Sequence, residues 1–211
     1  MKNFIVMKLR QVFTIAILLL AQTICKSQKI NFKISNLTAG IKSIEITSGN
    51  IILLINEDDN ISSVNSIAGG DFDYWSDGYG ALSGKIKSIG DINVDYWSSG
   101  YGILSGKVKS VGNTDFDYWS SGYGAFSGKL KSIGNINLDY WSSGYGVLSG
   151  KLRSIGNINL DYWSDGYGSL SGKPKTIGNI KIDYWSDGYG SLSGKVKSIT
   201  GNSSSIYVTV E

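Results

Sequence analysis

The chain has 211 residues, with 20 Lys and Arg against 17 Asp and Glu, a single Cys and no His. The absence of His excludes Ser-His-Asp and Cys-His catalysis, and it excludes metal sites that are built on imidazole. With one Cys the chain can form no internal disulfide. The composition therefore predicts a non-catalytic protein that binds no metal and needs no cofactor.

The N-terminal segment has the pattern of a signal peptide. Three basic residues precede a mainly apolar run over residues 12–21, and this run is shorter than the ~20 residues that a transmembrane helix needs. We expect export followed by cleavage after Ser27, so that residues 1–27 are removed and the mature chain does not span a membrane. Lipidation of Cys25 is the alternative, and the cleavage site stays open. The exported protein would be secreted, periplasmic or held at the cell surface.

Cleavage would also change the charge balance. Residues 1–27 hold four of the 20 basic residues and none of the 17 acidic ones. Residues 28–211 then carry 16 basic and 17 acidic side chains, a net charge of −1. Nucleic-acid binding would need a basic patch on the folded part of the chain. The sequence therefore predicts no nucleic-acid partner.

Residues 28–70 have the composition of degenerate N-terminal capping repeats. Their β-branched runs are short and are separated by turn-like Asn, Gly and Asp, as seen at 30–34, 41–47 and 51–56. Residues 205–211 form an alternating apolar and polar strand at the other end of the chain. Terminal units of a repeat stack differ from the consensus because they must protect its last sheet edges. We therefore expect a C-terminal capping strand at 205–211.

Between these segments a 22-residue unit occurs six times, over residues 71–204. Each unit contains Asp-Tyr-Trp-Ser-(Ser/Asp)-Gly-Tyr-Gly and, further on, Lys-x-Lys-Ser-Ile-Gly-Asn or a close variant. A fixed period of this length indicates a repeat protein whose units bury their apolar faces against one another. Apolar residues occupy even-numbered positions, such as Val94 and Leu104, which we expect to face the core. The pattern predicts an all-β fold with two strands and two turns per unit.

Two architectures fit this unit. In a two-sheet parallel β-solenoid each unit is one coil, and identical residues stack at ~4.8 Å. In an antiparallel β-hairpin meander each unit is a hairpin, and Lys85 would lie across from Asp95. We favour the solenoid for three reasons. A coil buries both apolar faces, three-residue turns would leave hairpin strands of unequal length, and a β-branched residue such as Val111 would lie at the hairpin tip.

Part of the unit resembles a known repeat. Residues 96–102, Tyr-Trp-Ser-Ser-Gly-Tyr-Gly, are similar to MORN repeats, which are short hairpin units with spaced Tyr, Trp and Gly-x-Gly. The similarity covers seven of the 22 residues, and the Lys-x-Lys-Ser-Ile-Gly-Asn segment departs from that pattern. We base neither the fold nor the function on it.

The aromatic residues of the repeat are the candidate binding residues. Rings at regular spacing beside Asp, Ser and Asn would offer flat apolar platforms with polar rims, a composition favoured at recognition surfaces. These residues are Trp75, Trp97, Trp119, Trp141, Trp163, Trp185, Tyr79, Tyr101, Tyr123, Tyr145, Tyr167 and Tyr189. The alternative is that the rings cover one another and only stabilise the fold. The repeated Lys residues, here called the Lys ladder, run from Lys85 and Lys87 to Lys195 and Lys197. They either bind an anionic polysaccharide or form a solvated face.

The repeated carboxylates predict neither catalysis nor a metal site. Glycoside hydrolysis needs two carboxyls in different environments, whereas the Asp before each Tyr-Trp pair recurs in all six units. A calcium loop would need the second Asp of each unit, which is Ser in three of the six. The sequence predicts a secreted or cell-surface protein of bacterial type that presents an aromatic and charged ladder for binding an extended glycan or an envelope component, as in adhesion. The alternative is a structural or spacer protein without a small-ligand site.

Overall fold

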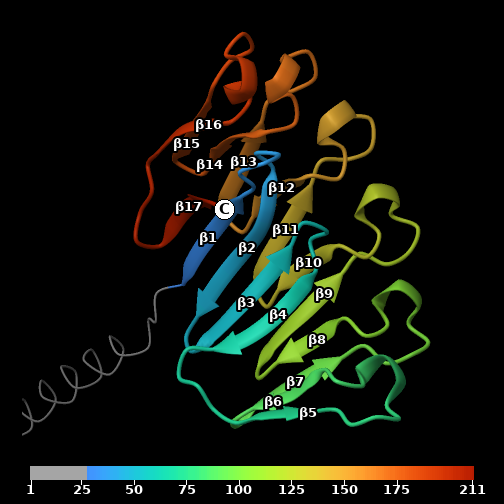
Figure 1. The fold of residues 1–211 in the computed structure, drawn as a ribbon. Helices are drawn as coiled ribbons and strands as arrows, with labels where there is room; N and C mark the ends of the chain where they lie inside the picture. Colours follow the sequence, from blue (N-terminus) through green and yellow to red (C-terminus); the bar gives the residue numbers. More distant parts are fainter. Residues whose placement is uncertain (1–27) are drawn as a thin grey trace, which may run out of the picture.

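The computed structural model describes residues 28–211, which form an all-β fold of 17 strands in two sheets (Figure 1). The predicted signal peptide, its cleavage site and Cys25 lie outside the described residues. None of the described helices is long and apolar enough to cross a membrane.

The smaller sheet, here called the flanking sheet, joins the two ends of the chain. Its strand order is β17-β1-β2-β3-β4, and its only parallel pair is β1 with β17, which places Ile30 beside Ile206. The two segments expected to cap opposite ends of the repeats therefore lie side by side. The strands are β1 (Lys29–Ile34), β2 (Ile41–Ser48), β3 (Ile51–Asn56), β4 (Ile61–Ser66) and β17 (Ile206–Val210).

The larger sheet, here called the repeat sheet, contains 12 strands from the six units, in the order in which they follow along the chain. Each strand pairs antiparallel with its sequence neighbours, as in the hairpin alternative. All pairs among the described strands of this sheet are antiparallel. Its strands are β5 (Phe72–Tyr74), β6 (Ile86–Ile89), β7 (Ile92–Tyr96), β8 (Val108–Val111), β9 (Thr114–Tyr118), β10 (Leu130–Ile133), β11 (Ile136–Tyr140), β12 (Leu152–Ile155), β13 (Ile158–Tyr162), β14 (Pro174–Ile177), β15 (Ile180–Tyr184) and β16 (Val196–Thr200).

The short turn that joins each unit to the next has two residues, not the three assumed from the sequence. Val111 pairs with Thr114 across Gly112 and Asn113, and Gly112 has φ +56°. A glycine with positive φ at the first turn position suits a type II′ hairpin turn, whose twist matches that of the strands. Val111 is thus a buried strand residue opposite Val94 rather than a residue at the hairpin tip.

The other connection in each unit is a long loop rather than a short turn. In the second unit it runs from Trp97 to Lys107, and two hydrogen bonds close its base: Trp97 N–H donates to the Lys107 carbonyl at 2.9 Å, and Gly106 N–H donates to the Trp97 carbonyl at 2.7 Å. Each loop contains a single-turn 3-10 helix, and the six loops project in a row from one side of the repeat sheet (Figure 1). The helices are η1 (Gly80–Leu82), η2 (Gly102–Leu104), η3 (Gly124–Phe126), η4 (Gly146–Leu148), η5 (Gly168–Leu170) and η6 (Gly190–Leu192).

The core lies between the two sheets. One apolar cluster combines side chains of the flanking sheet, such as Phe32 and Ile55, with Val94 and Leu138 of the repeat sheet. A β-bulge changes the expected alternation: Asp95 pairs with Ser110 but Tyr96 pairs with Val108, so one strand has an extra residue. Because of this extra residue, side chains at both even and odd positions of β8 are buried.

Candidate functional site

Each repeat unit packs its Trp ring against a Tyr and a cation. The ring centroids of Trp97 and Tyr101 lie 5.0 Å apart at 53°, and the Lys109 ammonium lies 5.4 Å from the centroid of the Trp97 ring. The loop turns back through η2, which brings Tyr101 against the residue four positions earlier. Equivalent Trp–Tyr pairs occur in all six units at 4.9 to 5.0 Å. Arg153 takes the place of Lys in the fourth unit.

The Tyr rings of these pairs are exposed, whereas the Trp rings are largely covered. The six predicted Tyr residues are 53 to 56% exposed. The Trp residues are all of intermediate burial, and in five of the six units the indole N–H is buried without a hydrogen-bond partner among the described residues. The structure thus brings the twelve predicted residues together in pairs. It is the Tyr members, not the Trp members, that offer ring surface to a partner.

The six loops that hold these pairs follow one another in a row (Figure 1). Each unit contributes two strands, so successive pairs are separated by about 10 Å along the direction of strand pairing. Neighbouring loops touch: a Cβ added at Gly128 would lie 3.1 Å from the side chain of Ile103 in the preceding unit. The Val147 N–H also points to the carboxylate of Asp165 in the following unit, at 3.4 Å. These contacts hold the rings at a regular spacing.

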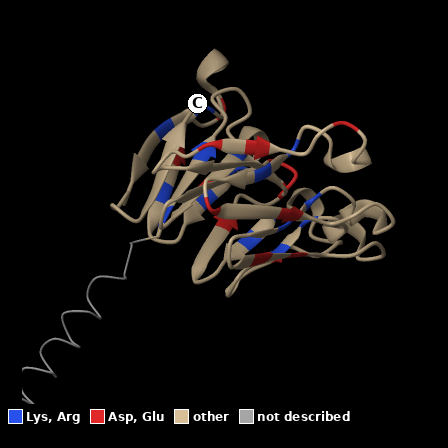
Figure 2. Cartoon of the chain, turned by 90° about the horizontal axis from the view of Figure 1, so that it is seen from below, with Lys and Arg blue, Asp and Glu red and all other residues tan. Residues whose placement is uncertain are grey.

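The outer charged residues of the repeat sheet include both signs. Lys87 lies 3.1 Å from Asp73, and Lys131 lies 3.7 Å from Asp117, in exposed ion pairs. Figure 2 shows acidic and basic residues interspersed over the strands. The ladder that could have formed a basic strip is therefore partly neutralised by the adjoining Asp residues.

In the first five units, the first Lys of the Lys-x-Lys or Lys-x-Arg segment lies over a Tyr ring of the next unit. In the hairpin alternative Lys85 would have faced Asp95, but its ammonium lies 5.2 Å from the ring centroid of Tyr96 and donates to the Gly106 carbonyl of the next unit. Lys129 makes the same kind of bond to Gly150, at 2.7 Å. Burial lowers the pKa of Lys85. These Lys residues tie consecutive units together rather than face solvent.

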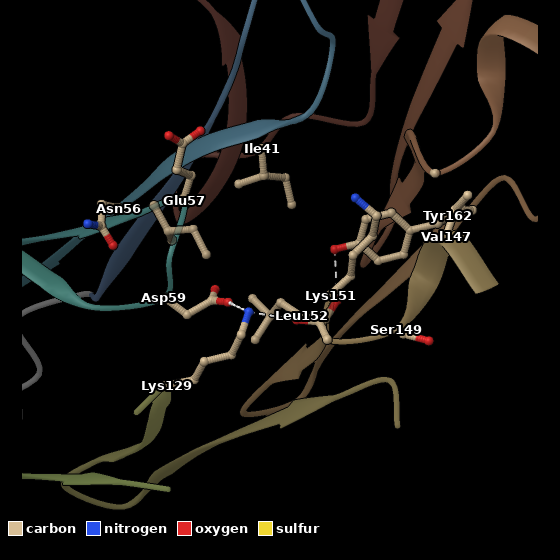
Figure 3. A pocket seen from close by; sticks show the side chains of 13 residues that line it. Ile41, Asn56, Glu57, Asp59, Lys129, Val147, Ser149, Lys151, Leu152 and Tyr162 are labelled. Atoms are coloured by element: carbon tan, nitrogen blue, oxygen red, sulfur yellow. Dashed lines mark hydrogen bonds and ion pairs between the residues drawn. The ribbon is translucent and has the colours of Figure 1, made fainter. Parts of the chain in front are cut away.

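A cavity of about 270 Å³ lies between the two sheets, beside the turn that joins β3 and β4 (Figure 3). Asp59, in that turn, has φ +55° and pairs with Lys129 at 2.7 Å. Burial raises the pKa of the Asp59 carboxyl, and the Lys129 charge opposes that rise. Lys151 also lines the cavity, and burial together with Lys129 lowers its pKa.

The chemistry of this cavity is that of a polar contact between sheets. Its one buried carboxylate already has a cationic partner, and the Tyr162 hydroxyl donates to the Leu152 carbonyl at 2.7 Å. Within residues 28–211 no group of three or more Asp, Glu, His or Cys is placed to hold a metal ion. Sequence reasoning missed this site because Asp59 and Lys129 are 70 positions apart. The only feature of the sequence that pointed to this region was the polar turn around Asp59.

Comparisons of the chain with protein-family models, with curated proteins and with solved structures give no match. A function must therefore be argued from the aromatic row and from the surfaces of the two sheets.

Proposed function

We propose that this is a non-catalytic repeat protein, a meander of β-hairpins that presents its row of exposed Tyr rings to an extended glycan or to another component of a cell envelope. The observation that carries the proposal is the repetition of one exposed Tyr, held against a Trp, in all six units. A sugar ring can stack on such a surface, and the Ser and Asp residues of the loop supply hydrogen-bonding groups beside it. The protein would be exported and act at or outside the cell surface.

The spacing of the rings supports an extended partner. Successive units are about 10 Å apart along the pairing direction, roughly the length of one disaccharide in an extended polysaccharide. Each contact would be weak, but binding at one ring raises the effective concentration of the chain at the next. Affinity should therefore rise with oligosaccharide length.

The mixed charge of the outer face supports a partner that is neutral or carries few charges. The Lys87–Asp73 and Lys131–Asp117 pairs leave little net positive potential for a polyanion. A strongly anionic polysaccharide would be the preferred ligand only if the Lys ladder were free of these carboxylates.

Binding can be tested with the variant Tyr123→Ala/Tyr145→Ala, which removes two adjacent exposed rings. Trp fluorescence reports on the site, because the Tyr145 ring lies 5.0 Å from the Trp141 ring. We expect the double variant to bind a panel glycan about tenfold more weakly or worse, since aromatic contacts dominate such interfaces. The matched control Tyr123→Phe/Tyr145→Phe keeps both rings and should keep most of the affinity. Equal affinity of the wild type and the alanine variant would disprove the proposal.

A structural or spacer role is the second candidate, and it is favoured by the covered Trp rings. In this role the Tyr, Trp and Lys stack serves only to hold each loop against its neighbour. The wild type would then respond to no glycan, while Tyr123→Ala/Tyr145→Ala would lower the thermal stability. The two candidates are separated by whether the wild-type fluorescence changes with any glycan of the panel.

A further inference from the structure

Both edges of the repeat sheet end in strands whose outer sides have no partner in the part of the chain that the structure describes. The strand order runs from β16 to β5 without a strand beyond either. Thr200 is the repeat equivalent of Gly178, the first turn residue after the preceding unit. The chain does not turn back at Thr200 but continues to β17. Unpaired backbone groups on such an edge can pair with another strand.

The β5 edge exposes apolar rings whose counterparts two units later are buried. Phe72 is 41% exposed and Tyr74 is 52% exposed, whereas their counterparts two units later, Phe116 and Tyr118, are 2% and 5% exposed. The Tyr118 ring is covered by Lys107 of the preceding unit, whose ammonium lies 5.4 Å from the ring centroid, and Phe116 lies near Ile46 and Leu53 of the flanking sheet. No unit of the described repeat sheet precedes β5. The Phe72 and Tyr74 rings stack on each other with their centroids 6.3 Å apart.

The β16 edge exposes the groups that would cover those rings. Lys173 reaches forward to the next unit, where its ammonium lies 5.8 Å from the Tyr184 ring and donates to the Gly194 carbonyl. Lys195 is the same position of the last unit, and it is exposed because no unit follows. Leu192 is likewise 41% exposed, against 8% for its counterpart Leu148.

We propose that the two edges bind each other between copies of this chain, so that β16 of one molecule pairs with β5 of the next. Lys195 would then contact Tyr74 and the Gly84 carbonyl of the second copy, because these are the repeat equivalents of the Lys173 partners. The strand register follows in the same way. Ser110 pairs with Asp115 and Val111 with Thr114, so Ser198 would pair with Asp71, and Ile199 with Gly70, of the next copy.

The association is head-to-tail, because the two surfaces are different. Such contacts leave a free edge at each end of every complex, and they build open chains when the rotation between copies does not close a ring. The exposed Tyr row of one molecule would then continue into that of the next. The interface is independent of glycan binding and can be tested without a ligand.

Sedimentation velocity of the full chain over a wide range of concentration tests the proposal. We expect species larger than a dimer to grow as concentration rises. Tyr74→Ala and Lys195→Glu should each weaken association about tenfold or more, as for central aromatic and charged interface residues. Lys197→Glu is the matched control, because Lys197 contacts Trp185 of its own unit and should leave association unchanged. A monomer at every concentration, growth that stops at a dimer, or an equal loss with Lys197→Glu would overturn the proposal.

Disulfide trapping provides a second test that checks the register. With Cys25→Ser as background, the variant Asp71→Cys/Ser198→Cys should form a ladder of covalent oligomers under mild oxidation. The control Asn137→Cys/Ser198→Cys places one thiol on β11, in the middle of the sheet, and should form no such ladder. Equal ladders from the two variants, or no covalent oligomers from the first, would exclude this pairing.

Discussion

Lys129 should be far more important to stability than the exposed Lys131 two residues later. Lys129 pairs at 2.7 Å with Asp59, and the two side chains are 21% and 11% exposed. Lys129→Met would remove the charge while keeping an apolar stem of similar length. Asp59 would then be a buried carboxylate that has lost its ion-pair partner and keeps only the weaker electrostatic influence of Lys151. Removing one partner of a buried ion pair lowers the free energy of unfolding by about 3–5 kcal/mol. Because this pair is partly exposed, we expect the low end of that range, about 3 kcal/mol at pH 7.

The loss should depend on pH with a defined sign. Burial already raises the pKa of the Asp59 carboxyl, and Lys129 opposes that rise, so in Lys129→Met the folded-state pKa rises further. The folded protein then holds a proton that the unfolded chain releases at a pKa of about 3.9. A proton bound more tightly in the folded state makes stability fall as pH rises through the window between the two pKa values. Lys129→Met should thus approach the wild-type stability as the pH is lowered towards that of free Asp.

Urea unfolding followed by circular dichroism at pH 7 and pH 5 measures both effects. Asp59→Asn should cost only about 1 kcal/mol, because the Lys129 ammonium keeps the Gly150 carbonyl as an acceptor. Lys131→Met is the control: its pair with Asp117 is exposed and 3.7 Å long, and such pairs contribute at most about 1 kcal/mol. The reasoning would be refuted if Lys129→Met lost no more unfolding free energy than Lys131→Met. It would also be refuted if the loss in Lys129→Met were not smaller at pH 5 than at pH 7.

Three further perturbations test other parts of the fold, all by the free energy of unfolding. Tyr140→Phe removes a buried hydrogen bond of 2.7 Å to the Leu130 carbonyl and should cost about 1 kcal/mol. Tyr118→Phe should be neutral or stabilising, since the Tyr118 hydroxyl is buried and has no hydrogen-bond partner within residues 28–211. Equal effects of the two substitutions would contradict this reasoning. Gly112→Ala should lower the free energy of unfolding by about 1 kcal/mol or more, because a residue with a Cβ is strained at φ +56°. The added Cβ would cause no clash, since its nearest neighbour lies 3.6 Å away. An unchanged free energy of unfolding would show that the turn rearranges. Burial raises the pKa of Tyr96 from 10.0 to about 12, so the stability that this group contributes below pH 10 should be lost as the pH rises through that window. The tyrosinate absorbance of Tyr96 is obtained as the difference between the wild type and Tyr96→Phe, and a difference that is already complete at pH 10 in the folded protein would exclude the shift.

The repeat unit, its β structure and much of its core could be predicted from the sequence. Val94 and Leu138 are at even positions and are buried, as alternation requires. Val111, at an odd position, is also buried because of the bulge in β8, which alternation cannot show. The length of the Gly-Asn turn was misjudged because its flanking β-branched residues were counted as part of it. That error made the hairpin strands seem unequal and favoured the solenoid.

The candidate site was predicted as a set of residues but not as a surface. The sequence predicted two strands and two turns per unit, and it did not show that Trp97 and Tyr101 belong to one long loop. It could not show that the 3-10 turn brings the Tyr ring against the Trp ring and leaves the Tyr outside. The cavity around Asp59 depends on contacts between distant segments, for which a single sequence carries no local signal. The same holds for the pairing of the two ends of the chain.

The parallel pairing of β1 with β17 has a consequence for how such a protein can change in length. Repeat proteins commonly gain or lose whole units, because each unit contacts only its neighbours. Here one further unit in the array would displace β17 from β1 by about two strand spacings, roughly 10 Å. That displacement would break a ladder of five residue pairs, from Ile30 with Ile206 to Ile34 with Val210. The number of units is therefore selected together with the flanking sheet, and duplication of a unit becomes a folding defect instead of a neutral extension.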